Sequence, residues 1–317
     1  MKICVAGAGA FGIKHLEALA KIEGVEVASL VGRTDATAEV AAKFGVPYWS
    51  TDLAQGLVQA GIEAAILATP TQLHAAQAAQ CLRAGKHVQV EIPMSDNLAD
   101  AEMLVALARE TGLVGMAGHT RRFNPSHQWV HKKIVAGELE ILQMDVQTYF
   151  FRRTNTNALG QPRSWTDNLL WHHACHTVDL FGYQVGEPIV QVHALQGPIH
   201  PVLGIAMDMS IQMKTASGAI CTLSLSFNND GPFGSFFRYI CDNGTYLARY
   251  DDLSNGKGEK IDLTGVAVSF DGIELQDREF FSAIEQKREP NSSFAQVLPA
   301  MRTLDALDRS LNGSPRA

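Results

Sequence analysis

Residues 2–12, "KICVAGAGAFG", decide the fold of the first part of the chain. A short apolar strand run leads into a glycine-rich turn that opens a helical stretch. In such a turn Gly7 permits the tight bend, Gly9 lets the backbone approach a pyrophosphate, and Gly12 lets the helix pack close to the strand. The free N–H groups at the start of the helix attract the phosphates. The predicted dinucleotide-binding residues are Gly7, Gly9, Ala10, Phe11 and Gly12.

Strand and helix signals alternate through the rest of the first 120 residues. Apolar strand runs such as "VEVASLV", "EAAILATP" and "KHVQVEIP" are separated by helical stretches that end at glycines, for example Gly45 and Gly85. Strands that are apolar at almost every position indicate a parallel sheet covered on both faces. We therefore predict an α/β Rossmann domain over residues 1–120.

The second half of the chain has a different pattern. "ILQMDVQTYFFRR", "MDMSIQMKT", "AICTLSLSF" and "FFRYICD" are long strand-like runs, several of them alternating, and "DNG" is a hairpin signal. Helices are expected at "RRFNPSHQWVHKKIVAGEL", at "HHACHTVDLFGYQ" and after about residue 277. Residues 121–317 are therefore predicted to form an α+β domain with a large, mostly antiparallel open sheet.

Composition excludes several classes of function. The chain has 317 residues and a formal net charge of −7, which disfavours nucleic acid and anionic membranes as partners. Its five cysteines are scattered, without a C-x-x-C pair, which is typical of a reducing compartment. The sequence opens directly into a strand and contains no long apolar run, so we expect neither a signal peptide nor a membrane span. We expect a cytoplasmic protein.

The end of the second strand, "SLVGRTD", bears on the choice of dinucleotide. NAD sites usually place a carboxylate there for the ribose hydroxyls, whereas here Arg33 and Thr34 come first. A guanidinium can hold a 2′-phosphate through a bidentate, charge-assisted pair, and a hydroxyl can assist it. We predict NADP as cofactor, with NAD as the weaker possibility because Asp35 follows directly.

Five motifs in order, "GAGAFG", "ATPTQLH", "AGKHVQVEIP", "RRFNP" and "HHACHTVD", resemble the glucose–fructose oxidoreductase / inositol dehydrogenase (Gfo/Idh/MocA) family over nearly the whole chain. The resemblance implies hydride transfer between a secondary alcohol and a nicotinamide cofactor. It also implies a homodimer formed through the sheet of the C-terminal domain. Further cofactor contacts implied by the resemblance are Thr69, Pro70, His74 and Glu91.

The chain departs from the family pattern at the groups that do chemistry. The lysine of the family's Glu-Lys-Pro motif is Ile92 here, and the aspartate of its Asp-x-Gly-x-His motif is His172. His176 stays in register, and an imidazole is suited to removing a hydroxyl proton near neutral pH. On a helix His172 shares its face and Asp179 comes within reach. We therefore predict His176 as the base, supported by His172 or Asp179.

The histidines also raise the question of a metal. His172 and His176 have a spacing that could chelate an ion. On a helix, however, Cys175 points about 100° away from His176, and no third ligand is evident. We predict no metal.

The substrate is predicted from what the site lacks and from its arginines. Without the lysine, a hydroxyl more acidic than that of a sugar is favoured, such as that of a cyclic hemiacetal, whose oxidation yields a lactone. Arginines clustered at "RRFNP" and "FFRRTNTNALGQPRSW" are suited to binding carboxylates. The arginines predict a substrate that carries carboxylates, and a resemblance, not the arginines, implies that it is a small dicarboxylate. The predicted substrate contacts are Arg121, Arg122, Arg163, His173, Trp165 as an apolar wall, and Ile92 packed against a flat ring.

Two alternatives stay open at this point. One is a sugar or polyol dehydrogenase of the same fold, acting on neutral substrates. The other is a non-catalytic NADP-binding sensor or regulatory subunit, which would bind the cofactor without turnover.

Overall fold

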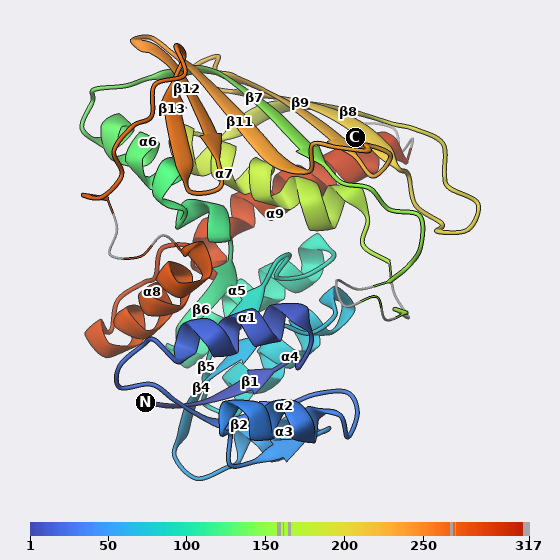
Figure 1. The fold of residues 1–317 in the computed structure, drawn as a ribbon, viewed down its shortest axis with the longest axis vertical. Coiled ribbons are helices and arrows are strands. Elements are labelled where there is room, and N and C mark those ends of the chain that lie inside the picture. The colour runs from blue at the N-terminus through green and yellow to red at the C-terminus, as the bar shows by residue number, and fades with distance from the viewer. Residues whose placement is uncertain (157–159, 161, 164–165, 267–268, 270, 313–317) are drawn as a thin grey trace. The chain divides into compact units, whose positions relative to one another are not determined.

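A computed structural model gives the structure of residues 1–156, 160, 162–163, 166–266, 269 and 271–312 (Figure 1). The chain divides into two compact units: Met1–His119 with Ile273–Leu298, and Thr120–Gly272 with Pro299–Ala317. From the sequence, a first domain was predicted over residues 1–120 and a second over 121–317, so residues 273–298 were assigned to the second.

The first unit is built on a six-stranded sheet with the order β3-β2-β1-β4-β5-β6, and its described strand pairs are all parallel. Its strands are β1 (Lys2–Ala6), β2 (Glu26–Val31), β3 (Trp49–Ser50), β4 (Ile62–Leu67), β5 (His87–Glu91) and β6 (Gly115–Gly118). Its helices are α1 (Ala10–Leu19), α2 (Thr37–Phe44), α3 (Leu53–Leu57), α4 (Thr71–Arg83), α5 (Leu98–Thr111) and most of α8 (Gly272–Gln286). The predicted parallel sheet is confirmed.

The burial of the strands explains why they were recognised. Ile3, Cys4, Val5 and Ala6 of β1 are all fully buried, as expected for a central strand covered on both faces. Right-handed crossovers place α1 and α2 on one face of the sheet and α3, α4 and α5 on the other. The strand order reverses direction between β1 and β4, and such a switch point is where open α/β sheets bind ligands, at the carboxyl ends of the strands.

The second unit contains a seven-stranded sheet with the order β13-β12-β11-β7-β10-β9-β8. Only the β7–β10 pair is parallel among the described pairings, so the predicted mostly antiparallel sheet is also confirmed. Its strands are β7 (Ile141–Tyr149), β8 (Ile189–Gln196), β9 (Asp208–Thr215), β10 (Ile220–Ser226), β11 (Gly234–Cys241), β12 (Gly244–Arg249) and β13 (Asp252–Asn255). Burial alternates along β9 and β10, which places one face of the sheet in the core.

Helices cover that inner face (Figure 1). They are α6 (Pro125–Val135), α7 (Cys175–Val185) and the part of α9 (Phe294–Leu311) that follows Leu298. The expected helix at "HHACHTVDLFGYQ" consists of two parts, because a π-helical turn, Leu169–Ala174, runs directly into α7. Single π-helical turns are rare and occur frequently at functional sites.

Two further observations concern the sequence-based exclusions. All five cysteines are buried. Among the residues that the structure describes, none of the helices combines the length and the apolar character needed to cross a bilayer.

Candidate active site

The turn after β1 has the shape of a phosphate cradle. A Cβ at Gly7, whose φ is +119°, would lie 2.3 Å from the carbonyl oxygen of Ala68, and one at Gly12 would lie 1.7 Å from that of Gly7. Gly9 has no atom within 4 Å of its would-be Cβ, so open space adjoins it. Gly9 is also the N-cap of α1, which has no side-chain cap and no acidic residue in its first turn. The backbone therefore fits a bound pyrophosphate.

The loop after β2 presents the residues predicted to select the cofactor. A Cβ at Gly32 would lie 2.0 Å from Oγ1 of Thr37, which donates a hydrogen bond of 2.6 Å to the carbonyl of Thr34. This tight turn leaves Arg33, Thr34 and Asp35 exposed. The N-terminus of α2 next to it has no side-chain cap. Arg33, Thr34 and the uncapped N-terminus of α2 are suited to binding a phosphate. Asp35 stays available to a ribose.

His74 holds the loop between β4 and α4, and its ring nitrogens are therefore not left for a ligand. His74 is 1% exposed, with Nδ1 2.7 Å from the carbonyl oxygen of Pro93 and Nε2 2.8 Å from that of Thr69. Thr69 Oγ1 donates to Gln77, and Pro70 precedes α4 as its N-cap. Because both ring nitrogens of His74 face backbone carbonyls, any effect on a cofactor passes through the loops that it joins.

Glu91 and Ile92 end the neighbouring strand, β5. Glu91 Oε1 accepts hydrogen bonds from His15 Nε2 (3.1 Å) and from Gln276 Nε2 (3.2 Å). Burial would raise the pKa of Glu91, but its contacts with His15 keep that pKa below the usual range. Ile92 is 6% exposed. The chain itself covers almost all of the Ile92 surface, which favours a packing role over the predicted contact with a substrate ring.

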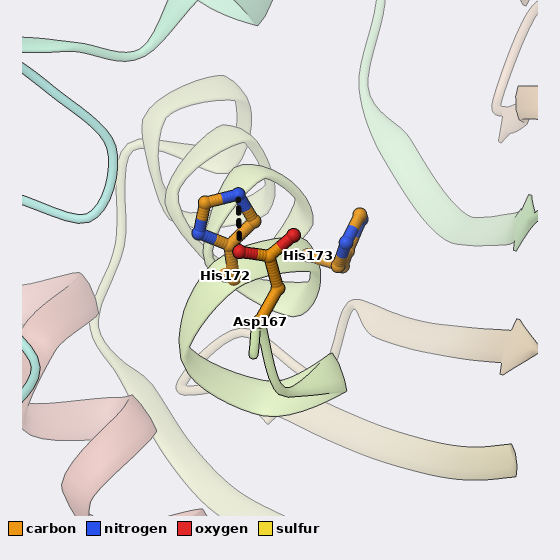
Figure 2. A group of neighbouring side chains, drawn as sticks. All are labelled: Asp167, His172 and His173. Carbon is orange, nitrogen blue, oxygen red and sulfur yellow. Dashed lines mark ion pairs between the residues drawn. The ribbon is translucent and has the colours of Figure 1, made fainter. Parts of the chain in front are cut away.

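In the second unit, an acidic residue brings two arginines and two histidines together. Asp167 Oδ2 accepts hydrogen bonds from Arg152 Nη2 (2.9 Å) and Arg163 Nη1 (2.8 Å), and Asp167 Oδ1 lies 3.7 Å from His172 Nε2. Figure 2 shows the Asp167 carboxylate beside the His172 ring, with the His173 ring nearby. We call Arg152, Arg163, Asp167, His172 and His173 the Asp167 cluster.

The charges of the Asp167 cluster follow from burial and from its arginines. Burial would raise the pKa of Asp167, but His172 and the two guanidinium groups lower it to about 2. Burial and the same positive neighbours lower the pKa of His173 to about 3, so this ring is neutral. The cluster therefore carries two permanent positive charges and one negative charge.

Asp167, His172 and His173 also bring their ligand atoms within 4.8 Å of one another, a grouping that could hold a metal ion. This group of possible ligands differs from the pair His172 and His176, whose spacing in the sequence could chelate an ion. A cation there would compete with two guanidinium groups for the same carboxylate. The absence of a metal stays a prediction.

Arg122 has a different position from the predicted substrate contact. It is 3% exposed, and its Nε and Nη2 donate to the two carboxylate oxygens of Asp179 at 2.8 and 2.6 Å. Its guanidinium also lies 4.5 Å from the ring centre of Tyr183. Both oxygens of Asp179 accept from Arg122 in a buried ion pair, and the support of His176 by Asp179 stays a prediction. The two residues are 57 positions apart, and no local pattern announced their pairing.

The other predicted residues are placed as follows. Arg121 is half-buried against Phe237 and Tyr250, and its Nη2 donates to Ser235 Oγ at 3.0 Å. His176 is half-buried in the first turn of α7. Arg163 donates to the carbonyl oxygen of Thr156 as well as to Asp167, and Trp165 lies outside the described residues.

One member of the Asp167 cluster, Asp167 itself, was missed as a site residue, whereas Arg152 was among the arginines suited to binding carboxylates. Asp167 has no family motif, but Arg163 and Asp167 are spaced i, i+4, a spacing that indicates a local ion pair. His15 was missed as well. A histidine on the apolar face of α1 was the available signal, and this residue is 0% exposed.

Comparison with known proteins identifies the fold and the chemistry. Residues 1–119 match the oxidoreductase family with an NAD-binding Rossmann fold (Gfo/Idh/MocA), and residues 125–267 match the C-terminal domain of bacterial oxidoreductases. The chain is 65% identical over 312 residues to 4-carboxy-2-hydroxymuconate-6-semialdehyde dehydrogenase of Sphingobium sp. (strain NBRC 103272 / SYK-6), covering 98% of this chain and 99% of that one. It is 27% identical to inositol 2-dehydrogenase of Mycolicibacterium smegmatis, over 79% and 72% of the two chains.

Solved structures agree on the fold. Levoglucosan dehydrogenase in complex with NADH superimposes with a TM-score of 0.86 at 20% identity, covering 98% of this chain and 97% of that one. The chain therefore belongs to the Gfo/Idh/MocA oxidoreductase family and is an NAD(P)-dependent dehydrogenase.

Proposed function

We propose that the protein oxidises the cyclic hemiacetal form of 4-carboxy-2-hydroxymuconate-6-semialdehyde to 2-pyrone-4,6-dicarboxylate, with NADP⁺ as the oxidant. One observation carries the proposal: 65% identity to a dehydrogenase of that name, over nearly the full length of both chains. The enzyme would then belong to the catabolism of aromatic compounds through protocatechuate.

The reaction needs a base and a hydride acceptor. His176 takes the proton from the hemiacetal hydroxyl, while the hydrogen on the same carbon leaves with its electron pair. Bound NADP⁺, which Gly7, Gly9 and Gly12 would hold, would supply the acceptor for this hydride. The carbon–oxygen bond becomes the carbonyl of the lactone, and one proton is released for each NADPH formed. A hemiacetal hydroxyl is more acidic than that of a sugar, which reduces the need for the lysine replaced by Ile92.

The Asp167 cluster supports a substrate that carries carboxylates. Its two guanidinium groups are only partly neutralised by Asp167, and His172 beside them is half-buried, in contact with solvent. Arg152 Nη1 has no hydrogen-bond partner within the part of the chain that the structure describes. Arg152 and Arg163 replace Arg122 as the proposed carboxylate contacts, because Arg122 is already committed to Asp179.

The test is NADPH formation from the ring-fission product, generated in place from protocatechuate by a 4,5-dioxygenase. Rapid reduction of NADP⁺ with this substrate, and none with inositol or glucose, is the expected result. Turnover of a neutral sugar alone would refute the hemiacetal proposal and favour the polyol dehydrogenase. Binding of NADP⁺ without turnover of any substrate would contradict the catalytic role of His176.

Two variants separate the proposed roles. His176→Gln is expected to lower kcat by roughly 100-fold or more, because it removes the general base. Arg152→Gln is expected to raise KM by roughly 10-fold or more through loss of a charge-assisted contact. Arg153→Gln is the matched control, since Arg153 is exposed and, among the described residues, donates to Arg152 O, Phe227 O and Asn228 Oδ1. If Arg152→Gln and Arg153→Gln raised KM equally, the proposed contact between Arg152 and a substrate carboxylate would be contradicted.

Assembly and location are proposed with the activity: a cytoplasmic homodimer formed through the seven-stranded sheet. Strand β8 leaves Val190 and Leu195 62% and 63% exposed, which favours a covering partner. Light scattering after gel filtration tests this proposal. A monomeric mass, or a dimer that persists in Leu195→Lys with Val190→Lys, would contradict it.

A further inference from the structure

A fully buried histidine in α1 lies between two carboxylates of the first unit. His15 Nδ1 is 3.0 and 2.9 Å from the two oxygens of Asp277, and its Nε2 is 3.1 Å from Glu91 Oε1. Gln89 Nε2 donates to Asp277 Oδ1 at 2.7 Å. His15 and Asp277 have fully buried side chains, so the charges are shielded from water.

Both ring nitrogens of His15 face carboxylate oxygens, an arrangement that favours a proton on each nitrogen. Burial alone would lower the pKa of His15, but the charges and hydrogen bonds of Asp277 and Glu91 outweigh it and raise that pKa to about 10. The ring is therefore an imidazolium. His74 on α4 is a further titratable neighbour of Glu91. Burial lowers the pKa of the His74 ring.

The same contacts fix the orientation of Glu91. Oε1 is taken by His15 and Gln276, and a Cβ at Gly118 would lie only 2.7 Å from it. No described residue donates a hydrogen bond to Oε2, and the Glu91 side chain is 11% exposed. One oxygen is held inside the protein, and the other is left for a hydrogen-bond donor from outside.

The position of Glu91 indicates which donor this is. The pyrophosphate cradle follows β1, and Arg33 follows β2 on one side of it. Glu91 ends β5 on the other side of the β1–β4 switch point, at the same carboxyl edge of the sheet. If the adenosine half of the dinucleotide extends toward β2, its nicotinamide half extends toward β4 and β5.

We infer that His15 is a positioning residue for the nicotinamide half of the cofactor: it holds Glu91 ionised, with Oε2 turned outward to accept a hydrogen bond from a hydroxyl or amide of that half. His15 does not touch the cofactor, and Asp277 keeps its ring protonated and oriented. The inference rests on dinucleotide binding and not on the identity of the substrate.

The test measures binding of NADP⁺ by calorimetry, without substrate, between about pH 6 and pH 9. Glu91→Gln is expected to weaken binding by roughly 10- to 100-fold at every pH, because it removes the accepting charge. His15→Gln removes the cation that keeps Glu91 ionised. Its binding is expected to be weak at the acidic end and to recover toward the wild-type value as Glu91 ionises with rising pH.

The control is His127→Gln, which replaces another fully buried histidine, one whose Nδ1 bonds to Tyr239 Oη. It is expected to leave the Kd unchanged. A His15→Gln protein with wild-type affinity at every pH, or with a loss that does not vary with pH, would overturn the inference.

A second measurement uses the wild-type protein, so it does not depend on whether a variant folds. ¹⁵N NMR of the histidine rings in the unliganded wild-type protein is expected to show one ring doubly protonated up to about pH 9. A neutral His15 at that pH would equally overturn the inference. Failure of the proposed substrate in turnover assays would leave both measurements unaffected.

Discussion

Replacing Arg122 by methionine tests whether this residue holds the fold or the substrate. The change keeps an apolar stem of similar length but removes the guanidinium from the Asp179 carboxylate. Asp179 would then keep a charge in a site where its side chain is 1% exposed, without the Arg122 guanidinium beside it. We expect loss of stability, not loss of substrate affinity.

The magnitude follows from the contacts. Arg122 donates two hydrogen bonds, at 2.8 and 2.6 Å, across a buried ion pair, and it stacks 4.5 Å from the Tyr183 ring centre. Breaking a buried pair by removing one partner typically costs about 3–5 kcal/mol. For a unit of this size each kcal/mol lowers Tm by roughly 2–4 °C, so a decrease of roughly 6–20 °C is expected.

Urea unfolding followed by tryptophan fluorescence measures this effect, because Trp129 and Trp171 lie in the second unit. The double variant Arg122→Met with Asp179→Leu is expected to regain most of the lost stability, since no buried charge is left alone. Arg153→Met, at an exposed arginine, is expected to change the free energy of unfolding by less than about 0.5 kcal/mol.

The opposite pattern would refute the structural role. If Arg122→Met unfolds like the wild type and raises the KM for the substrate instead, Arg122 contacts substrate. If the double variant is less stable than the single one, the ion pair is not the source of the loss.

Three further predictions concern the first unit. Arg33→Ala is expected to weaken NADP⁺ binding by roughly 10-fold or more while leaving the Kd for NAD⁺ within about twofold. Calorimetry measures both Kd values, and equal losses of affinity for NADP⁺ and NAD⁺ would contradict a contact between Arg33 and the 2′-phosphate. Gly118→Ala is expected to weaken binding of either dinucleotide, because its Cβ would lie 2.7 Å from Glu91 Oε1; unchanged Kd values would show that Glu91 is free to move. The pKa of His15 is raised to about 10, above its ordinary value of 6.5, so its contribution to stability is complete below pH 6.5 and is lost as the pH rises toward 10. Urea titrations of the wild type should show this decline, and in His15→Gln the decline should be absent; a wild-type stability that rises with pH over this range would contradict the sign.

The sequence predicted the parts of the fold that depend on local patterns. The glycines of the first turn, the apolar strands of the parallel sheet and the alternating runs of the second sheet each follow from neighbours in the chain. Strand β3 has only two residues and was not predicted, because so short a strand has no periodicity to detect.

The site was predicted less completely, because its contacts join distant residues. Arg122 and Asp179 are 57 positions apart, and His15 and Asp277 are 262 apart. Residue type alone suggested that Arg122 binds a substrate carboxylate, and only the fold shows that a carboxylate of the protein already occupies it. The Asp167 cluster was partly visible, since Arg163 and Asp167 are close in sequence, but the approach of Arg152 depends on the path of the chain after β7.

The return of residues 273–298 to the first unit affects how the protein is made. A ribosome releases Met1–His119 early, but that segment lacks Asp277 and Gln276, the partners of His15 and Glu91. The cofactor-binding unit can therefore complete its core only after nearly the whole polypeptide has been synthesised. For the same reason a chimera joined by a single crossover after residue 119 would bury His15 without Asp277 and Glu91 without Gln276. A transplant of this unit into another oxidoreductase has to carry both segments.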